Sequence, residues 1–263
     1  LSTPTKAETK NIICYSGGPN KPCQRGPMMA ARYFSYYAYT AFLIKDFIEK
    51  QPDAQLLKNY VKSGYQKYIL PFIEPNDPGI SQLLDGYIGK YSYAKLLDND
   101  SIADEALREG IKKIKIQLRP DGNISFSSFR GVRSYFYHSL AVDVILSFGE
   151  LAENAGLKFY SDHDLKQRIG KSIELLIKYA PDPKAFEAKG YYIAPDGLKA
   201  YSTDEKDALR YIIRQALALD VIIRYRYPEL VNEEVMEKYF PIAVNPDYVS
   251  QGGAGNFIDM AAG

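Results

Sequence analysis

The stretch RGVRSYFYHSLAVDVILSFGELAENAG, residues 130–156, decides the fold. From Ser134 onward its pattern is helical, because apolar side chains recur at spacings of three and four residues. Gly156 follows the last periodic residue, where glycine commonly ends a helix in the left-handed conformation. The stretch therefore predicts a helix over residues 134–155.

Helical patterns extend outward from this stretch in both directions. No segment shows the sustained alternation of apolar and polar residues that is typical of strands. Asp53, Ser101 with Asp104, and Ser161 or Asp162 are expected to cap helices. The turn from Arg119 to Gly122 is expected to end one. The further helices that we expect cover residues 28–50, 54–73, 81–97, 102–118, 162–179, 204–225 and 232–240.

The predicted helices pair into antiparallel hairpins that stack side by side, so the fold class is all-α. Such an array can close into an incomplete α/α toroid, and a flatter helical repeat array is the competing architecture. Residues 1–26 are expected to form an irregular arm, residues 27–245 one domain and residues 246–263 a flexible tail. Residues 180–203, rich in Pro and Gly, are expected to form a long loop of the kind that is often functional.

Bulk composition excludes several function classes. Lys and Arg number 33 against 32 Asp and Glu, and this net charge of +1 gives no field that would favour nucleic acid. No run of 18 apolar residues occurs, so no membrane span is expected. The 23 Tyr stand out, because a Tyr ring can stack on a sugar while its hydroxyl donates a hydrogen bond.

Two cysteines and the first residues of the chain point to an exported protein. Cys14 and Cys23 flank a turn-rich segment that can bring them together, which predicts one disulfide in an oxidising compartment. The polar stretch that follows Leu1 is typical of a mature chain after removal of a signal peptide. We therefore expect a periplasmic or secreted location.

The start of the helix at 134–155 carries the strongest candidate chemistry. Tyr135, Tyr137 and His138 lie close to Arg130 and Arg133 in the sequence. Because Arg133 and Tyr137 are four residues apart, they share one face of a helix. A guanidinium beside a phenol lowers the pKa of the phenol and prepares it for proton transfer. A buried packing corner of Tyr and Arg side chains is the alternative interpretation.

The segment RSYFYHSLAV, residues 133–142, resembles the motif that opens an inner helix in the mannuronate-type alginate lyases, an α/α-toroid family that includes polyglucuronate-cleaving members. The following residues 146–160 are similar in kind, and the resemblance covers roughly residues 85–180. It implies a lyase that neutralises the C5 carboxylate of a uronate, removes the C5 proton and protonates the leaving oxygen.

The resemblance assigns roles to individual residues. Arg133 corresponds to the arginine that binds the substrate carboxylate, Tyr137 to a base or acid, and His138 to a second base or an orienting group. The catalytic tyrosine of the family, seven residues after that arginine, falls here on Leu140. No histidine occupies the place of the family's Asn-Asn-His near residues 76–86, where Gln82 offers an amide instead.

Further residues are candidates for contacting substrate. They are Arg130, Tyr135, Gln82, Tyr191, Tyr192, Arg210 and Arg214. No cofactor and no metal are expected, and the expected partner is an anionic polysaccharide or oligosaccharide. Two other functions stay open: a catalytically inactive protein that binds polyuronate or exopolysaccharide, and a structural helical array with protein partners.

Overall fold

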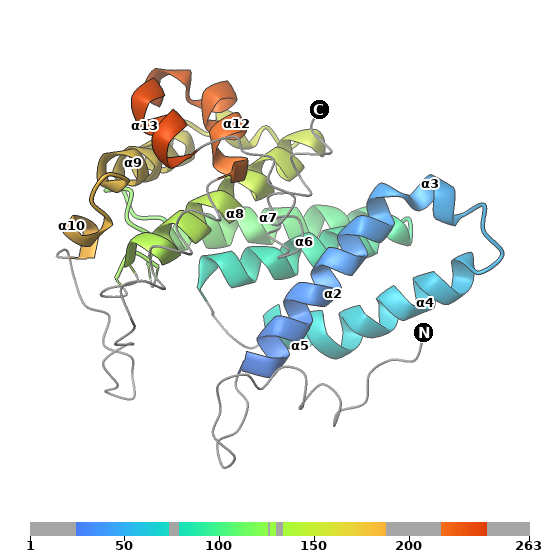
Figure 1. Cartoon of the computed structure of the whole chain (residues 1–263). Coiled ribbons are helices and arrows are strands. Elements are labelled where there is room, and N and C mark those ends of the chain that lie inside the picture. Colours follow the sequence, from blue (N-terminus) through green and yellow to red (C-terminus); the bar gives the residue numbers. More distant parts are fainter. Residues whose placement is uncertain (1–24, 74–78, 126, 130–133, 188–216, 241–263) are drawn as a thin grey trace, which may run out of the picture. The chain divides into compact units, whose positions relative to one another are not determined.

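Helices dominate the architecture (Figure 1). The computed structural model describes residues 25–73, 79–125, 127–129, 134–187 and 217–240. Within these ranges the sole β element is an isolated antiparallel bridge between Leu118 and Ile124, so the predicted all-α class is confirmed. None of the helices in these ranges is both long and apolar enough to cross a membrane. The predicted disulfide partners Cys14 and Cys23 lie outside the described residues.

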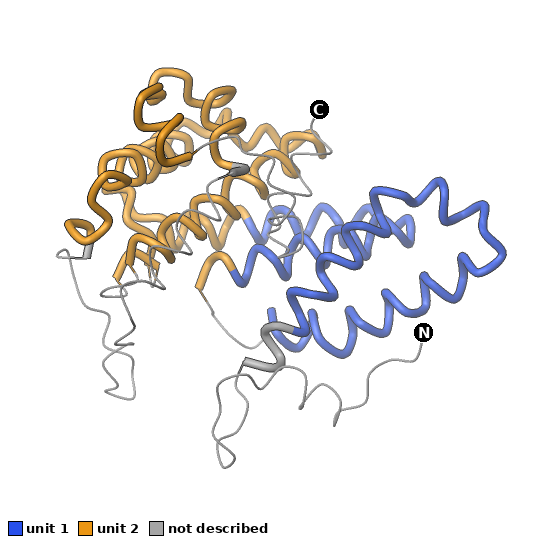
Figure 2. Tube along the Cα trace, viewed as in Figure 1, with its two compact units in different colours: residues 1–78, 82–110 blue, residues 79–81, 111–263 orange. Residues whose placement is uncertain are grey.

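The chain divides into two compact units (Figure 2). Unit 1 comprises residues 1–78 and 82–110, and unit 2 comprises residues 79–81 and 111–263. The first helices in the chain are α2 (Arg25–Leu43), α3 (Lys45–Ile48), α4 (Ala54–Gly64), the π-helical turn η1 (Tyr65–Ile69), α5 (Leu70–Ile73), α6 (Ile80–Leu96) and α7 (Asp100–Gln117). They are followed by α8 (Ser134–Asn154), the 3-10 turn η3 (Phe159–Ser161), α9 (His163–Tyr179), α10 (Pro183–Glu187), α12 (Leu217–Arg226), η4 (Pro228–Leu230) and α13 (Glu233–Tyr239).

Most predicted helices lie within two residues of their observed positions, and the differences have local causes. The helix predicted for 54–73 is interrupted by the π-helical turn η1, and the one predicted for 28–50 breaks after Leu43. The loop predicted for 180–203 begins instead with helix α10. Periodicity misses α10, because five residues are too few to establish a helical repeat.

Capping residues fix several helix ends. Asn99, rather than Ser101, caps α7, because its Oδ1 accepts a hydrogen bond from the Ile102 amide at 3.1 Å. Asp162 caps α9 as predicted, since its Oδ1 accepts from the Leu165 amide at 3.0 Å. Gly122 and Gly156 take φ angles of 83° and 85°, in the left-handed region that residues with a Cβ atom disfavour. They lie in the turns that follow α7 and α8, where the sequence predicts a helix stop.

The core of unit 1 forms where α2 meets η1, α4 and α6. Phe34 of α2 stacks on Tyr68 of η1, with ring centroids 4.7 Å apart. Gly89 of α6 lies so close to α2 that a Cβ atom there would come within 2.8 Å of the Ser35 Cα. Glycine at this position therefore allows close contact between the two helix backbones.

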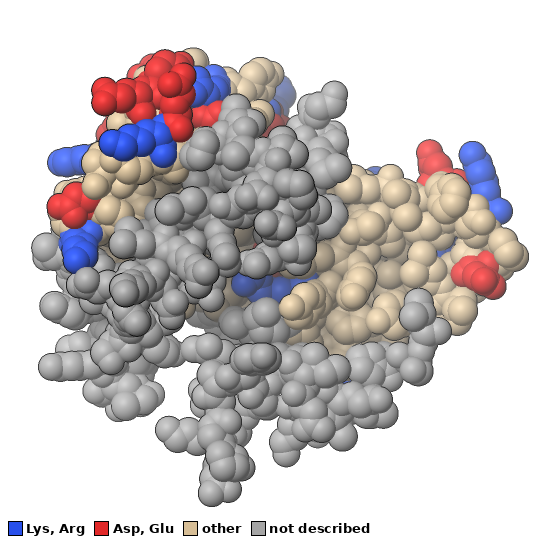
Figure 3. All heavy atoms as spheres, viewed as in Figure 1, with Lys and Arg blue, Asp and Glu red and all other residues tan. Residues whose placement is uncertain are grey.

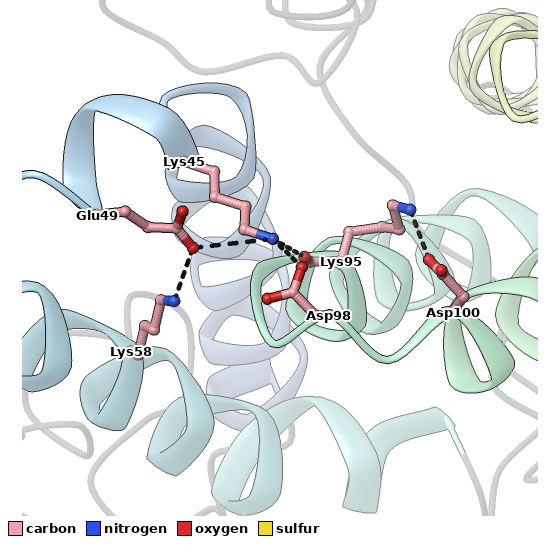
Figure 4. A network of polar contacts seen from close by, with 6 residues as sticks. All are labelled: Lys45, Glu49, Lys58, Lys95, Asp98 and Asp100. Carbon is pink, nitrogen blue, oxygen red and sulfur yellow. Dashed lines mark hydrogen bonds and ion pairs between the residues drawn. The ribbon is translucent and has the colours of Figure 1, made fainter.

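Ion pairs join α3, α4 and the turn between α6 and α7 (Figure 4). Lys45 pairs with both Asp98 and Glu49, and Glu49 also pairs with Lys58 at 2.9 Å. The Lys45 ammonium also donates to the carbonyl oxygen of Lys95 at 3.1 Å. Because these carboxylates are exposed, the pairs orient the elements more than they stabilise them.

Replacement of Gly89 tests the close approach of α2 and α6. In Gly89→Ala the new methyl group overlaps Ser35, so we expect the free energy of unfolding to fall by about 1–3 kcal/mol. Urea denaturation followed by circular dichroism measures this change. Gly79→Ala is the matched control, because a Cβ at Gly79 would meet no atom within 4 Å. Equal stability of the two variants would contradict this close packing.

Candidate active site at the start of helix α8

Helix α8 is the central helix of unit 2. It packs against α9, α10, α12 and η3. Most of its side chains from Ser134 to Ala152 are buried, including polar ones such as Ser139 and Ser147. Gly149 contributes to this packing, because a Cβ there would come within 2.7 Å of the Phe159 ring. The start of this helix carries the sequence-predicted site.

His138 is fully buried and hydrogen-bonded at both ring nitrogens. Its Nδ1 lies 2.9 Å from the Ser128 Oγ, and its Nε2 lies 3.0 Å from the Ser172 carbonyl oxygen. A carbonyl oxygen can only accept, so Nε2 carries the proton and donates it to Ser172. In the neutral ring Nδ1 then accepts from the Ser128 hydroxyl, which itself accepts from the Ile124 amide at 2.7 Å.

Desolvation keeps this imidazole neutral. Burial lowers the pKa of His138 to about 4, and the hydrogen bond to Ser172 opposes this shift. Phe186 of α10 contributes to the burial, because its ring centroid lies 5.0 Å from that of His138. A sealed ring with both nitrogens occupied does not favour the role of second base, whereas it favours the predicted orienting role.

The network joins the segment before α8 to helix α9. The Ser172 hydroxyl donates to the Gly122 carbonyl oxygen at 2.5 Å, and Lys171 donates to that of Pro120 at 2.9 Å. Arg168 donates to the Leu118 carbonyl oxygen at 3.2 Å. The turn that the sequence predicts only as a helix stop is thus docked on α9 through its backbone carbonyls.

Tyr135 is a packing residue in this structure. Its side chain is 2% exposed, and its hydroxyl donates to the Leu176 carbonyl oxygen at 2.9 Å. Burial raises the pKa of Tyr135 well above its usual range, which disfavours the phenolate. The predicted substrate contact of Tyr135 is therefore not favoured, and the alternative of a packing corner applies to this residue.

Tyr137 differs from Tyr135 and His138 because it is partly exposed, as Phe136 beside it also is. Its ring packs edge-on against that of Phe136, with centroids 5.0 Å apart. Leu140, at the place of the family's catalytic tyrosine, is buried. Among the titratable side chains between Tyr135 and His138, Tyr137 is thus the one that the described structure leaves accessible.

The other predicted site residues are separated from this group or not described. Gln82 lies half-buried in the first turn of α6, within unit 1. No group of three or more His, Cys, Asp or Glu that could hold a metal ion occurs in the described parts of the chain. The predicted contacts outside the described residues are Arg130, Arg133, Tyr191, Tyr192, Arg210 and Arg214.

Sequence reasoning missed a clamp that holds α12 on α8. Arg226 donates two hydrogen bonds to the Glu150 carboxylate, at 2.8 and 2.7 Å. Its guanidinium lies 4.7 Å from the Tyr160 ring centroid and 4.6 Å from that of Tyr225. The sequence offers no signal for this pair, because 76 residues separate Arg226 from Glu150.

The buried imidazole predicts a pH dependence of stability. The pKa of His138 is about 4 in the folded chain, whereas the ordinary value for histidine is 6.5, so below pH 6.5 the unfolded chain binds a proton that the folded chain does not. The free energy of unfolding should therefore fall by up to about 3 kcal/mol between pH 6.5 and pH 4. Urea denaturation across this range measures the effect.

His138→Gln should be less stable at pH 7 and should lose this part of the pH dependence, because glutamine does not titrate. His163→Gln is the matched control, since His163 is the one other histidine of the chain and its side chain is exposed. An identical fall in stability for wild type and His138→Gln would show that His138 does not cause it.

Comparison with known proteins tests the resemblance. Residues 89–186 match the family model of the alginate lyases, a range that includes all of α8, α9 and the His138 network. No curated protein matches the chain at a significant level. The match covers the part of the chain on which the predicted resemblance rests, and it shows that residues 89–186 are similar to the alginate lyase family.

Proposed function

We propose that the chain is a polysaccharide lyase that cleaves a uronate-containing polysaccharide, of the alginate or polyglucuronate type, by β-elimination. The observation that carries the proposal is the placement of Tyr137. It lies within the segment that matches the alginate lyase family, and it stays partly exposed where Tyr135 and His138 are buried. In this proposal the helices form an incomplete α/α toroid, and the chain acts in the periplasm or outside the cell.

Tyr137 is the proposed base and acid. As a phenolate, it removes the C5 proton of the uronate, and the electron pair of the C5–H bond forms the C4–C5 double bond. The C4–O bond breaks, and the same phenol returns its proton to the leaving oxygen. Atoms and charge balance, since the tyrosine ends as the phenolate with which it began.

Arg133 is the proposed carboxylate clamp, one helical turn before Tyr137 in the sequence. The negative charge that develops on the uronate needs a fixed positive group nearby, and a guanidinium can bind a carboxylate through two parallel hydrogen bonds. Arg130 is a further proposed substrate contact. The reaction as proposed needs no cofactor.

His138 is proposed as a positioning residue. It holds Ser128, and Ser128 precedes the segment that carries Arg130 and Arg133 by two residues. Ser134, directly after Arg133 in the sequence, begins α8, so a described element stands on each side of the two arginines in the sequence: Ser128 in the His138 network and the first turn of α8.

A catalytically inactive polyuronate-binding protein is the second candidate function. The observation in its favour is Leu140, a buried aliphatic residue where the family has its catalytic tyrosine. An aliphatic side chain cannot exchange a proton, so cleavage depends on Tyr137 alone. Binding of oligouronates without any unsaturated product would select this function.

Tyr137→Phe tests the lyase proposal. Loss of the hydroxyl removes the base and acid while the ring keeps its packing against Phe136, so turnover should fall by about 10²–10⁴-fold. The assay follows the ultraviolet absorbance of the new C4–C5 double bond with alginate, polyglucuronate, hyaluronate and pectate. Arg133→Ala should abolish turnover while the fold survives.

Tyr225→Phe is the control, because it removes the hydroxyl of an exposed tyrosine, 72% accessible, on another helix of unit 2. It should retain the wild-type rate. Wild-type turnover in Tyr137→Phe would exclude Tyr137 from the chemistry.

A further inference from the structure

Helix α2 presents a polar and aromatic face in unit 1 that the lyase proposal does not use. We call the set Arg32, Tyr33, Tyr36 and Tyr37 the α2 face. Residues four apart lie above one another on a helix, so Arg32 and Tyr36 form one column and Tyr33 and Tyr37 the next. Tyr33 is 53% exposed and Tyr37 is 56% exposed, whereas Arg32 and Tyr36 are partly buried.

A buried carboxylate holds Arg32 in place. The Arg32 Nε lies 2.7 Å from the Oδ2 of Asp85 on α6, and the Asp85 side chain is 1% exposed. The close approach of Gly89 to Ser35 brings α2 and α6 near enough for this contact. Burial raises the pKa of Asp85 and the Arg32 guanidinium opposes the rise, so the pair depends on both partners.

The Arg32 guanidinium keeps donors for a ligand. Its Nη2 donates to the Tyr36 hydroxyl at 3.3 Å, and its Nε points to Asp85. An arginine has five N–H donors, and the described residues provide no acceptor for the other three. Because two neighbours fix the plane of the group and its side chain is 21% exposed, it is a preorganised donor at the surface.

The tyrosine column has a firm support. Tyr37 packs edge-on against Phe34, with ring centroids 6.0 Å apart, and Phe34 in turn packs on Tyr68 and Tyr60. The exposed ring therefore lies on a packed aromatic layer. In the view of Figure 3, the described surface of unit 1 is mostly uncharged, with charged side chains at the end that carries α3 and basic atoms near the middle of the molecule.

We propose that the α2 face binds a segment of the acidic polysaccharide. Two exposed rings offer flat surfaces for the faces of pyranose units, and the remaining N–H groups of the Arg32 guanidinium offer hydrogen bonds to sugar hydroxyls and carboxylates. The nearly neutral surroundings suit a ligand that is held by ring stacking and hydrogen bonds. The choice of a uronate polymer rests on the proposed function, while the face itself belongs to unit 1.

The test is affinity electrophoresis of the full chain through gels that contain alginate, polyglucuronate or a neutral glucan. All proteins carry Tyr137→Phe in addition, so that the polymer stays intact whether or not the chain is a lyase. Tyr33→Ala with Tyr37→Ala should weaken binding to at least one uronate polymer by about tenfold or more. Circular dichroism should stay unchanged, because both side chains are exposed.

Two further variants make the test specific. Arg32→Lys keeps a positive charge beside Asp85 but loses the planar set of donors, so the fold should hold while binding weakens by roughly threefold to tenfold. Tyr225→Ala removes a more exposed tyrosine, 72% accessible, from another helix and should bind as the parent does. A protein partner at the exposed apolar residues Ile44 and Phe47, next to the end of α2, is the alternative. Association that Ile44→Ser with Phe47→Ser prevents, without any sugar binding, would overturn the α2 face.

The outcomes separate this inference from the proposed function. If a uronate gel retards the parent protein and the double variant Tyr33→Ala, Tyr37→Ala is retarded less, the α2 face is supported. This holds even if the wild-type chain releases no unsaturated product. If the wild-type chain releases unsaturated product and the double variant binds as tightly as its parent, the α2 face is overturned and the lyase proposal stands. Absence of retardation in every uronate gel also overturns it.

Discussion

The hydrogen bonds of His138 are the constraint on which unit 2 depends. One imidazole joins Ser128, before helix α8, to the backbone of Ser172 in helix α9. It can do so only as the neutral tautomer with its proton on Nε2, because the Ser172 carbonyl cannot donate. Burial lowers the pKa of His138 and so favours the neutral ring that these hydrogen bonds between Ser128, α8 and α9 require.

The sequence predicted the helices well because their signals are local. Caps such as Asp162 and stops such as Gly156 act within a few residues. The periodicity of a helix can likewise be recognised from the sequence of that helix alone. The sequence did not predict helix α10, because this helix is a single short turn after Pro181. Phe186 of α10 nevertheless packs against His138 and helps to bury it. This burial favours a positioning role for His138 over a role in proton transfer.

The site was harder to predict, because burial is a tertiary property. Tyr135, Tyr137 and His138 lie within four residues and carry similar chemistry in the sequence. Their environments differ because α9 and α10 cover one side of α8, where Tyr135 reaches the Leu176 carbonyl, and leave Tyr137 partly exposed. The family motif identified the segment, whereas the roles proposed for its residues rest on the packing.

Two arginines of similar exposure differ in what surrounds them. Arg226 and Arg32 have side chains that are 22% and 21% exposed. Both oxygens of Glu150 engage Arg226, and the rings of Tyr160 and Tyr225 lie against it. Arg32 contacts Asp85 through one nitrogen and the Tyr36 hydroxyl through another. Each arginine uses two of its five N–H donors in these contacts, but the surrounding rings differ: two rings lie against Arg226, whereas exposed tyrosines neighbour Arg32 on α2. This difference supports the proposal that the α2 face binds a ligand.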